Sequence, residues 1–217
     1  MTDPQISEAS DSLLDFFEYQ WGNNEGQIYL ATLNKGSEFT QYMLEWPRLK
    51  KAIVRFALAQ SAEGRDVYFS PALFLPKADT IEFSIKGSTT AERVNIKGAQ
   101  MLWADFDDGS APTDWVKFSA DKGIPEPTLI IQSSVPGNQH VYWKTEFTTM
   151  VSDIEQLNRS IALVAGADRS GWDANQLLRP PYTQNYGYRG NGQRKPWYKG
   201  HPVEVTIIET DQNAKVQ

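Results

Sequence analysis

The sequence contains no cysteine and only two histidines, His140 and His201. Disulfide bonds and thiolate zinc sites are therefore excluded. Any bound metal must be held mainly by carboxylate oxygens, which are the ligands that Mg²⁺ and Mn²⁺ prefer. We therefore expect no zinc.

Long hydrophobic runs are missing as well. No stretch approaches the roughly 18 apolar residues that span a bilayer. Residues 1–18 carry five acidic and no basic residues, the opposite of the positively charged start of a signal peptide. We expect a cytoplasmic protein without a membrane partner.

Acidic side chains are absent from residues 174–203, although the whole chain carries a net charge of -6. That charge argues against a general nucleic-acid coat protein, because phosphate binding depends on clustered Lys and Arg. Five basic residues nevertheless lie in this stretch among several aromatics, namely Arg179, Arg189, Arg194, Lys195 and Lys199. Negative charge is therefore concentrated in residues 1–18 and positive charge in residues 174–203.

What the sequence does contain is a hydrophobic stretch ending in two acids, residues 100–109. In a strand, alternate side chains share a face, so Trp103, Asp105 and Asp107 would project one way and Phe106 the other. Asp and Gly favour turns, which places both carboxylates at the end of the strand. Carboxylates so close together repel each other unless a cation such as Mg²⁺ or Mn²⁺ lies between them.

The remaining pattern predicts an α/β (α+β) protein of 217 residues, with 40% hydrophobic and 12% aromatic residues for a core. Helices are expected from an N-cap at Asp11 to Trp21, from Pro47 in the first turn to Ala62, over 113–122, and from a capping box at Ser152 and Glu155 to Gly166. Strands are expected over 27–33, 67–69, 100–106, 128–134, 140–144 and 201–209, with a loop over 86–97.

A candidate phosphate-binding hairpin follows the acidic strand. His140 opens a strand directly after the Ser133–Ser134 pair and a loop containing Gly137 and Asn138. Hydroxyls, loop amides and an imidazole on one rim can hold a polyphosphate together. The alternative is a partly buried histidine bonded to a neighbouring carbonyl.

A third carboxylate can come from Asp168 or Asp173. Asp173 has the pattern of an N-cap for a short helix over 174–179, which Pro180 would stop. Asp168 has no such local role in the sequence. We therefore favour Asp168 as the metal ligand and keep Asp173 as the second candidate.

Taken in order, these motifs resemble the archaeo-eukaryotic primase superfamily, and in particular the primase-polymerase domains of plasmid, phage and mobile-element replication proteins. The first motif is Asp105-Phe106-Asp107, the second is Ser133-Ser134 with His140, and the third is Ala167-Asp168 with Arg179 downstream. The likeness covers roughly residues 65–190.

The resemblance implies an αβ module at about residues 10–98, packed against an RRM-like module at about residues 99–209, with the active site in the cleft between them. It implies template-directed nucleotidyl transfer from (d)NTPs, with two Mg²⁺ or Mn²⁺ ions held by Asp105, Asp107 and Asp168. The nucleotide would be bound by Ser133, Ser134, Gly137, Asn138, His140 and Arg179. DNA template and primer would be bound by Tyr182, Asn185, Arg189, Arg194, Lys195 and Lys199.

The resemblance also implies a replicative helicase, or further domains of a larger replication protein, as partners. Two other functions stay open. One is a catalytically silent nucleic-acid-binding module on the same fold. The other is a haloacid-dehalogenase-type phosphatase, because residues 105–110 resemble its Asp-x-Asp-Gly-Thr signature, although the additional Asp108 breaks the spacing.

Overall fold

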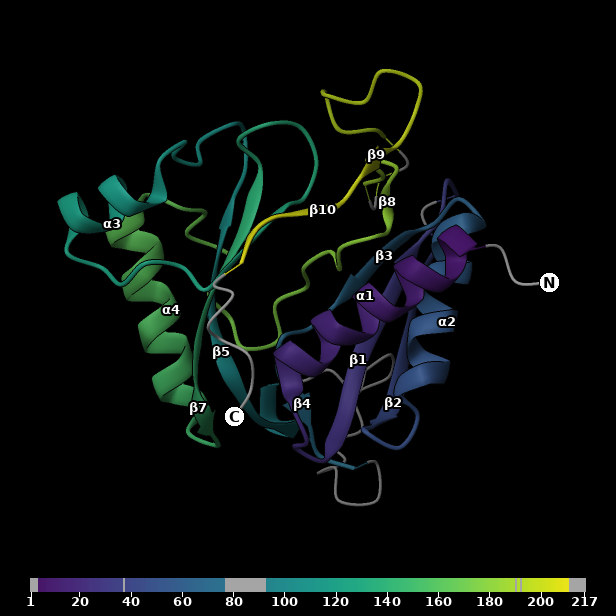
Figure 1. Cartoon of the computed structure of the whole chain (residues 1–217), viewed down its shortest axis with the longest axis horizontal. Helices are drawn as coiled ribbons and strands as arrows, with labels where there is room; N and C mark the ends of the chain where they lie inside the picture. The colour runs from purple at the N-terminus through teal and green to yellow at the C-terminus, as the bar shows by residue number, and fades with distance from the viewer. Residues whose placement is uncertain (1–3, 37, 77–92, 190, 192, 211–217) are drawn as a thin grey trace.

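The computed structural model describes residues 4–36, 38–76, 93–189, 191 and 193–210. In these ranges the chain folds into four α-helices and one large antiparallel sheet with a small two-stranded sheet beside it (Figure 1). The predicted α+β class is therefore confirmed. Within the same ranges, no helix is long and apolar enough to cross a membrane.

The helices are α1 (Pro4–Trp21), α2 (Lys50–Ala62), α3 (Trp115–Lys122) and α4 (Val151–Ala165). A 3₁₀ turn, η2, spans Arg93–Asn95. The strands are β1 (Gly26–Leu33), β2 (Phe39–Trp46), β3 (Asp66–Phe69), β4 (Leu73–Phe74), β5 (Ile96–Phe106), β6 (Leu129–Gln132), β7 (Gln139–Thr148), β8 (Gln184–Asn185), β9 (Val203–Glu204) and β10 (Thr206–Thr210).

The long strand β5 joins the two halves of the large sheet. The strand order is β10-β6-β7-β5-β4-β1-β2, with β3 paired to β1, and the small sheet is formed by β8 and β9. One end of β5 pairs with β4, and the acidic end pairs with β7. The division into modules at residues 10–98 and 99–209 stays a prediction, because β5 crosses this boundary and pairs with a strand on each side of it.

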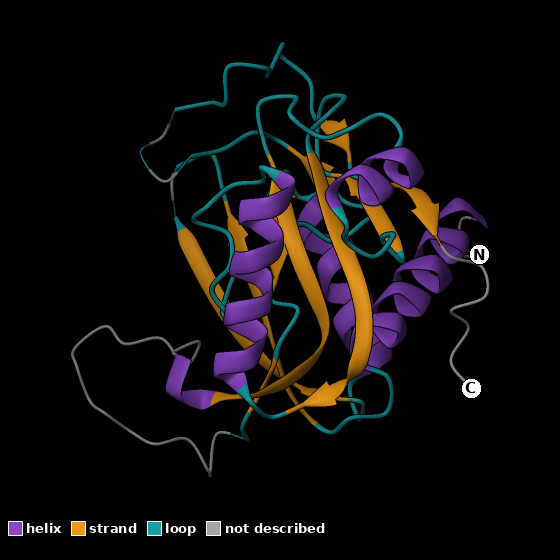
Figure 2. Cartoon of the chain, turned by 90° about the vertical axis from the view of Figure 1, so that its left-hand side faces the viewer, coloured by secondary structure: helices purple, strands orange, loops and turns teal. Residues whose placement is uncertain are grey.

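Helices cover both faces of the sheet around β5. Met101 and Trp103 point into the large core that also contains α1 and α2, whereas Ala104 and Phe106 point into a second core under α3 and α4. Seen from the side of that second core, α3 and α4 lie in front of the strands (Figure 2). The predicted alternation of side chains along this strand is confirmed.

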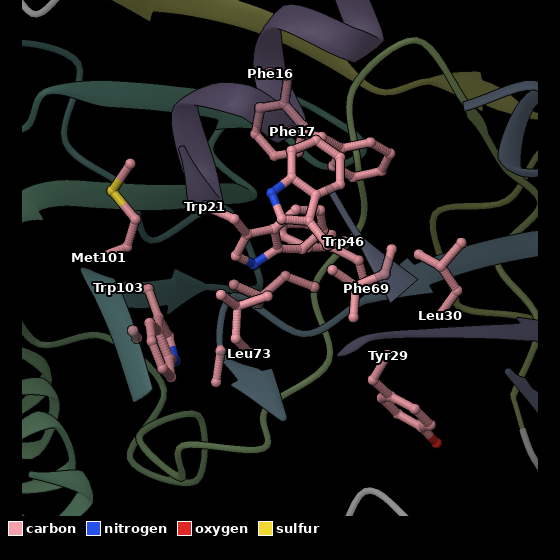
Figure 3. Packing of buried hydrophobic residues seen from close by; sticks show 14 of the residues in the cluster. Phe16, Phe17, Trp21, Tyr29, Leu30, Trp46, Phe69, Leu73, Met101 and Trp103 are labelled. Atoms are coloured by element: carbon pink, nitrogen blue, oxygen red, sulfur yellow. The ribbon is translucent and has the colours of Figure 1, made fainter. Parts of the chain in front are cut away.

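Aromatic packing fixes α1 against the sheet (Figure 3). The rings of Phe17 and Trp21 stack at 5.0 Å, and Trp21 meets Trp46 edge to face at 5.1 Å. Phe69 of β3 contacts Phe16 edge to face at 5.2 Å. Full burial of each such ring contributes about 2 kcal/mol through the hydrophobic effect, so this cluster is a main source of stability for the half that carries β3.

Two predicted helix starts are wrong. α1 begins at Pro4, so Asp11 lies inside the helix and does not cap it. Pro is favourable at the first helical position, where its missing N–H costs nothing. Pro47 lies in a turn before α2, in which the Lys50 N–H donates to the Pro47 carbonyl at 3.2 Å.

The predicted capping box at the start of α4 is also wrong. The N-cap is Met150, with no side-chain cap, and Ser152 lies inside the helix. Glu155 does not reach back to the N-terminus, because it accepts three hydrogen bonds of 2.6–2.8 Å from the guanidinium of Arg93. A charge-assisted bidentate pair is stronger than a neutral cap, so the long-range contact prevails.

The segment after Asp173 is not the predicted helix. Leu178 pairs with Phe69 of β3, exchanging backbone hydrogen bonds of 2.8 and 2.9 Å. An extended residue cannot belong to a helical turn, so Asp173 has no helix to cap.

Several strands differ from the sequence prediction; β4 and β8 were not predicted, and β7 extends to Thr148. The predicted strand 201–209 is divided into β9 and β10, because Val205 leaves the ladder and its N–H donates to the Thr183 carbonyl at 2.8 Å. β2 was not predicted; most of its residues are only half-buried, which weakens the alternation in the sequence. Residues 86–92 of the predicted loop (86–97) lie outside the described residues, and β5 already begins at Ile96, within the predicted loop.

Candidate active site

Asp105 and Asp107 lie at the acidic end of β5. Asp105 is the penultimate residue of the strand, and Asp107 immediately follows the last residue. Left-handed backbone at Asp108 (φ 58°) and Gly109 (φ 72°) then turns the chain away. The prediction that both carboxylates stand at the strand end is confirmed.

Asp168 is brought to the same place by backbone and core contacts. Its N–H donates to the carbonyl of Asp105 at 2.8 Å. Trp103 donates through Nε1 to the carbonyl of Gly171 at 3.1 Å, and its own backbone N–H donates to the buried Asn158 of α4 at 2.9 Å. These bonds hold the loop after α4 beside β5.

The three carboxylates form a cluster that could hold a divalent cation. One oxygen from each of Asp105, Asp107 and Asp168 lies within 4.8 Å of the others. Ligands at 2.0–2.6 Å from one ion lie within about 5 Å of each other, so the spacing fits. Asp105 Oδ1 is buried and has no hydrogen-bond partner in the described part of the chain, as expected for an oxygen reserved for a cation.

Asp168 belongs to this cluster with Asp105 and Asp107, whereas Asp173 does not. One detail of the sequence argument was nevertheless wrong, because Asp168 does have a local role. Its carboxylate accepts hydrogen bonds from the N–H and the hydroxyl of Ser170 at 2.8 and 2.9 Å. These bonds orient the carboxylate without neutralising its charge.

Burial and the neighbouring carboxylates together make Asp105 a weaker acid than a free aspartate. Burial, together with the charges of Asp107 and then Asp168, raises the pKa of Asp105 to about 7, although Arg179 and Lys195 act in the opposite direction. A cation in the cluster would reverse this effect by favouring the carboxylate form.

His140 is the direct cross-strand neighbour of Asp105. The two residues face each other in the β5–β7 register, with 3.6 Å between His140 Nε2 and Asp105 Oδ1. The imidazole is 3% exposed, and burial, followed by the charge of Arg179, lowers its pKa to about 3. In the absence of a bound anion, His140 is therefore neutral at physiological pH.

The predicted Ser-Gly hairpin is a tightly bonded loop packed on the Asp107–Gly109 turn. Asn138 is its organiser: Oδ1 accepts from the Gly109 N–H at 2.7 Å, and Nδ2 donates to Ser134 Oγ at 2.9 Å. Ser133 and Ser134 are both 3% exposed. Asn185, predicted to contact DNA, is 1% exposed and donates to the carbonyl of Ser133 at 2.7 Å. This bond joins the loop to the later segment.

Gly137 makes this close packing sterically feasible. It has a left-handed φ of 84°, and a Cβ atom there would lie 2.7 Å from Gly109 Cα. We expect Gly137→Ala to lower the free energy of unfolding by about 2–4 kcal/mol, from overpacking plus a left-handed alanine. Gly123→Ala is the control, with a similar φ of 66° and open space around the new atom, and should cost only about 1 kcal/mol. Equal losses in urea unfolding would refute this steric account.

Arg179, downstream of the third motif, is near enough for its charge to lower the pKa of Asp105, but its hydrogen bonds go to other residues. Its Nη2 lies 3.3 Å from Asp66 Oδ2 and 2.7 Å from the hydroxyl of Tyr68, and the guanidinium lies 4.6 Å from the centre of the Tyr68 ring. Asp66 is fully buried and was missed by the sequence analysis. A single Asp at the start of a short strand carries no recognisable pattern.

The stretch 182–199, which we call the basic-aromatic segment, lies on the Asp107 side of the cluster. Lys195 Nζ is 3.6 Å from Asp107 Oδ2. Arg194 is held between two rings, 3.7 Å from the centre of Tyr188 and 4.3 Å from that of Tyr198. The sequence analysis proposed these cations for nucleic-acid binding but gave no indication that one of them would contact the acidic cluster.

Three further residues of the basic-aromatic segment were predicted to bind DNA. Arg189 and Lys199 are exposed, and Tyr182 is half-buried with a left-handed φ of 63°. The two exposed cations can therefore reach a phosphate backbone without any rearrangement of the core.

Comparison with known proteins identifies the fold. Neither a family model nor a curated protein sequence matches this chain. Solved structures do match, with 93% of this chain covered in each case. At identities of 11–14%, these likenesses establish the fold alone.

The matching structures are a primase, its catalytic domain and a domain of a primase-polymerase. Primase RepB′ superposes with a TM-score of 0.61 at 14% identity, and its catalytic domain in complex with initiator DNA superposes with a TM-score of 0.60 at 14% identity. The archaeo-eukaryotic primase domain of the cyanophage S-2L primase-polymerase gives 0.61 at 11% identity. This chain spans 56% of the RepB′ chain, 85% of its catalytic domain and 90% of the cyanophage domain. The protein has the archaeo-eukaryotic primase fold, as its motifs predicted.

Proposed function

We propose that this protein is a DNA primase-polymerase, which transfers nucleotides from (d)NTPs to a growing strand under the direction of a template. The observation that carries the proposal is the cluster of Asp105, Asp107 and Asp168 at the end of β5, in a fold shared with primase catalytic domains. Two divalent ions, Mg²⁺ or Mn²⁺, would supply the means to activate a 3′-hydroxyl and to neutralise charge on the leaving pyrophosphate.

The chain's own residues would place the substrates around this cluster. Asp105 and Asp107 provide oxygens from β5, and Asp168 provides one from the loop that is bonded to it. Arg179 is the permanent positive charge on this side and would attract the triphosphate. His140, next to Asp105, would donate a hydrogen bond to a phosphate oxygen.

The phosphate-binding hairpin would contribute mainly through its backbone and one hydroxyl. Ser134 Oγ accepts a hydrogen bond from Asn138, which leaves its own proton to be donated to a phosphate oxygen. Ser133 and Gly137 shape the loop. This division of roles follows from the hydroxyl of Ser133, which already donates to the Asn138 carbonyl at 3.3 Å.

For the template strand, we propose the basic-aromatic segment. Arg189 and Lys199 would meet phosphates, and the half-buried ring of Tyr198 would offer a stacking face to a base. Lys195 would leave Asp107 for a phosphate once a metal ion binds there. A DNA helicase or another domain of a larger replication protein stays a predicted partner.

Pyrophosphate release distinguishes the candidate functions. The purified protein is incubated with a mixture of nucleotides, a single-stranded DNA template, a primer and Mn²⁺, and both pyrophosphate and inorganic phosphate are measured. A primase-polymerase releases pyrophosphate only when template and metal are both present. Release of inorganic phosphate without template would favour the phosphatase alternative, and binding of DNA without either product would favour the silent module.

A further inference from the structure

Asp66 is a fully buried carboxylate on which two functional parts of the molecule converge. It opens β3 beside α2, remote in sequence from every motif, and is 0% exposed. Its oxygens accept hydrogen bonds from Arg179, from the hydroxyl of Tyr68, and from the backbone N–H groups of Tyr186 and Tyr188. An ionised carboxylate can accept about four hydrogen bonds, so its capacity is filled.

The first of these parts is the cation of the third motif. Arg179 lies 3.3 Å from Asp66, with Tyr68 donating to one and accepting from the other at 3.4 and 2.7 Å. Burial raises the pKa of Tyr68 to about 12, so the phenol stays protonated. The guanidinium is thereby fixed in one orientation, close enough to Asp105 and His140 to act on the pKa of both.

The second part is the start of the basic-aromatic segment. The N–H of Tyr188 lies 3.0 Å from Asp66 Oδ2, and the N–H of Tyr186 donates to Oδ1. Residues 186 and 188 flank Gly187, whose φ of 65° is left-handed, so the carboxylate clamps the backbone on both sides of this bend. The rings of Tyr186 and Tyr188 stack at 5.9 Å, and Arg194 packs on the second ring.

We propose that Asp66 is a positioning residue that couples nucleotide binding at Arg179 to template binding at the basic-aromatic segment. This proposal rests on the proposed function. One carboxylate sets both the orientation of the Arg179 guanidinium and the path of the basic-aromatic segment. A shift of either one therefore changes the position of the other. Asp66 itself does not touch the substrates.

The test is Asp66→Asn, which keeps the shape but removes the charge and one acceptor oxygen. The matched control is Glu63→Gln, the same chemical change at a carboxylate three residues earlier, whose side chain is 57% exposed and pairs, among the described residues, with Gln60 and Arg65. We expect Asp66→Asn to raise the KM for nucleotide about tenfold and to weaken single-stranded DNA binding several-fold, with kcat at saturation within about threefold of wild type. Hydrogen exchange at the Tyr186 and Tyr188 amides should speed up about a hundredfold.

Several outcomes would overturn the proposal. A folded Asp66→Asn variant with wild-type KM and wild-type DNA affinity would show that Asp66 supports the fold alone. If that variant does not fold, Tyr68→Phe replaces it, because it removes only the hydroxyl between Asp66 and Arg179. A raised KM together with weaker DNA binding would then support the proposal, whereas an unchanged KM, or a raised KM with unchanged DNA affinity, would refute it.

DNA affinity and amide exchange need no turnover. If the wild-type protein makes no product, these two measurements still decide whether Asp66 holds the segment, and thermal shift by nucleotide with Mn²⁺ replaces the KM. Failure of the proposed function is therefore distinguishable from failure of this inference.

Discussion

Asp105→Asn is expected to abolish nucleotidyl transfer and to stabilise the metal-free protein. Loss of a metal-binding carboxylate removes several kcal/mol of transition-state stabilisation, so turnover should fall at least about a thousandfold. The gain in stability follows from the pKa of Asp105, which is raised to about 7 by burial and by Asp107. At pH 8 the folded wild-type protein must carry a charge that its surroundings disfavour, and the amide removes it.

The stability gain should be up to about 4 kcal/mol at pH 8 in the presence of EDTA, measured by urea unfolding, because the pKa of Asp105 rises from 3.8 to about 7. It should shrink as the pH falls below 7, because the raised folded-state pKa then leaves wild-type Asp105 protonated. Addition of Mn²⁺ should stabilise wild type and have little effect on the variant. Full activity of Asp105→Asn in saturating Mn²⁺ would remove Asp105 from the metal site.

The second large effect is expected at Asp168, in contrast to Asp173. Asp168→Asn should retain stability within about 1 kcal/mol, since an amide oxygen can still accept a hydrogen bond from Ser170. Activity should fall by at least about a hundredfold, because the neutral amide no longer holds a divalent cation. Asp173→Asn, at an exposed residue outside the cluster and without a helix to cap, should be nearly silent in both respects.

Primer extension and thermal unfolding of the two amide variants check this pair. An active Asp168→Asn protein together with an inactive Asp173→Asn protein would transfer the third ligand to Asp173. It would also contradict the geometry, in which Asp168 and not Asp173 donates its N–H to the carbonyl of Asp105.

The sequence predicted best the features that depend on the geometry of a single strand or a single helix. Alternation along residues 100–107 placed Asp105 and Asp107 on one face, and the spacing of apolar residues up to Gly166 located the end of α4, both of which the structure confirms. These patterns depend on local geometry alone. They therefore predicted the acidic end of the site before any tertiary contact was known.

Local patterns failed where a partner distant in sequence used the same atoms. Glu155 had the spacing of a capping box but is paired with Arg93, 62 residues earlier. Leu178 had a helical context but pairs with Phe69. Asp66 offered no pattern at all, since its four partners come together only in the folded chain.

The most direct test of the account is whether the template dictates the product. The protein is given a primed homopolymeric DNA template, Mn²⁺ and one nucleotide at a time, and extension is measured for all pairings of template and nucleotide. The proposal predicts extension with the complementary nucleotide on each template, and none with Asp105→Asn. Extension that ignores the template, or no extension by the folded wild-type protein under any pairing, would contradict templated nucleotidyl transfer at this site.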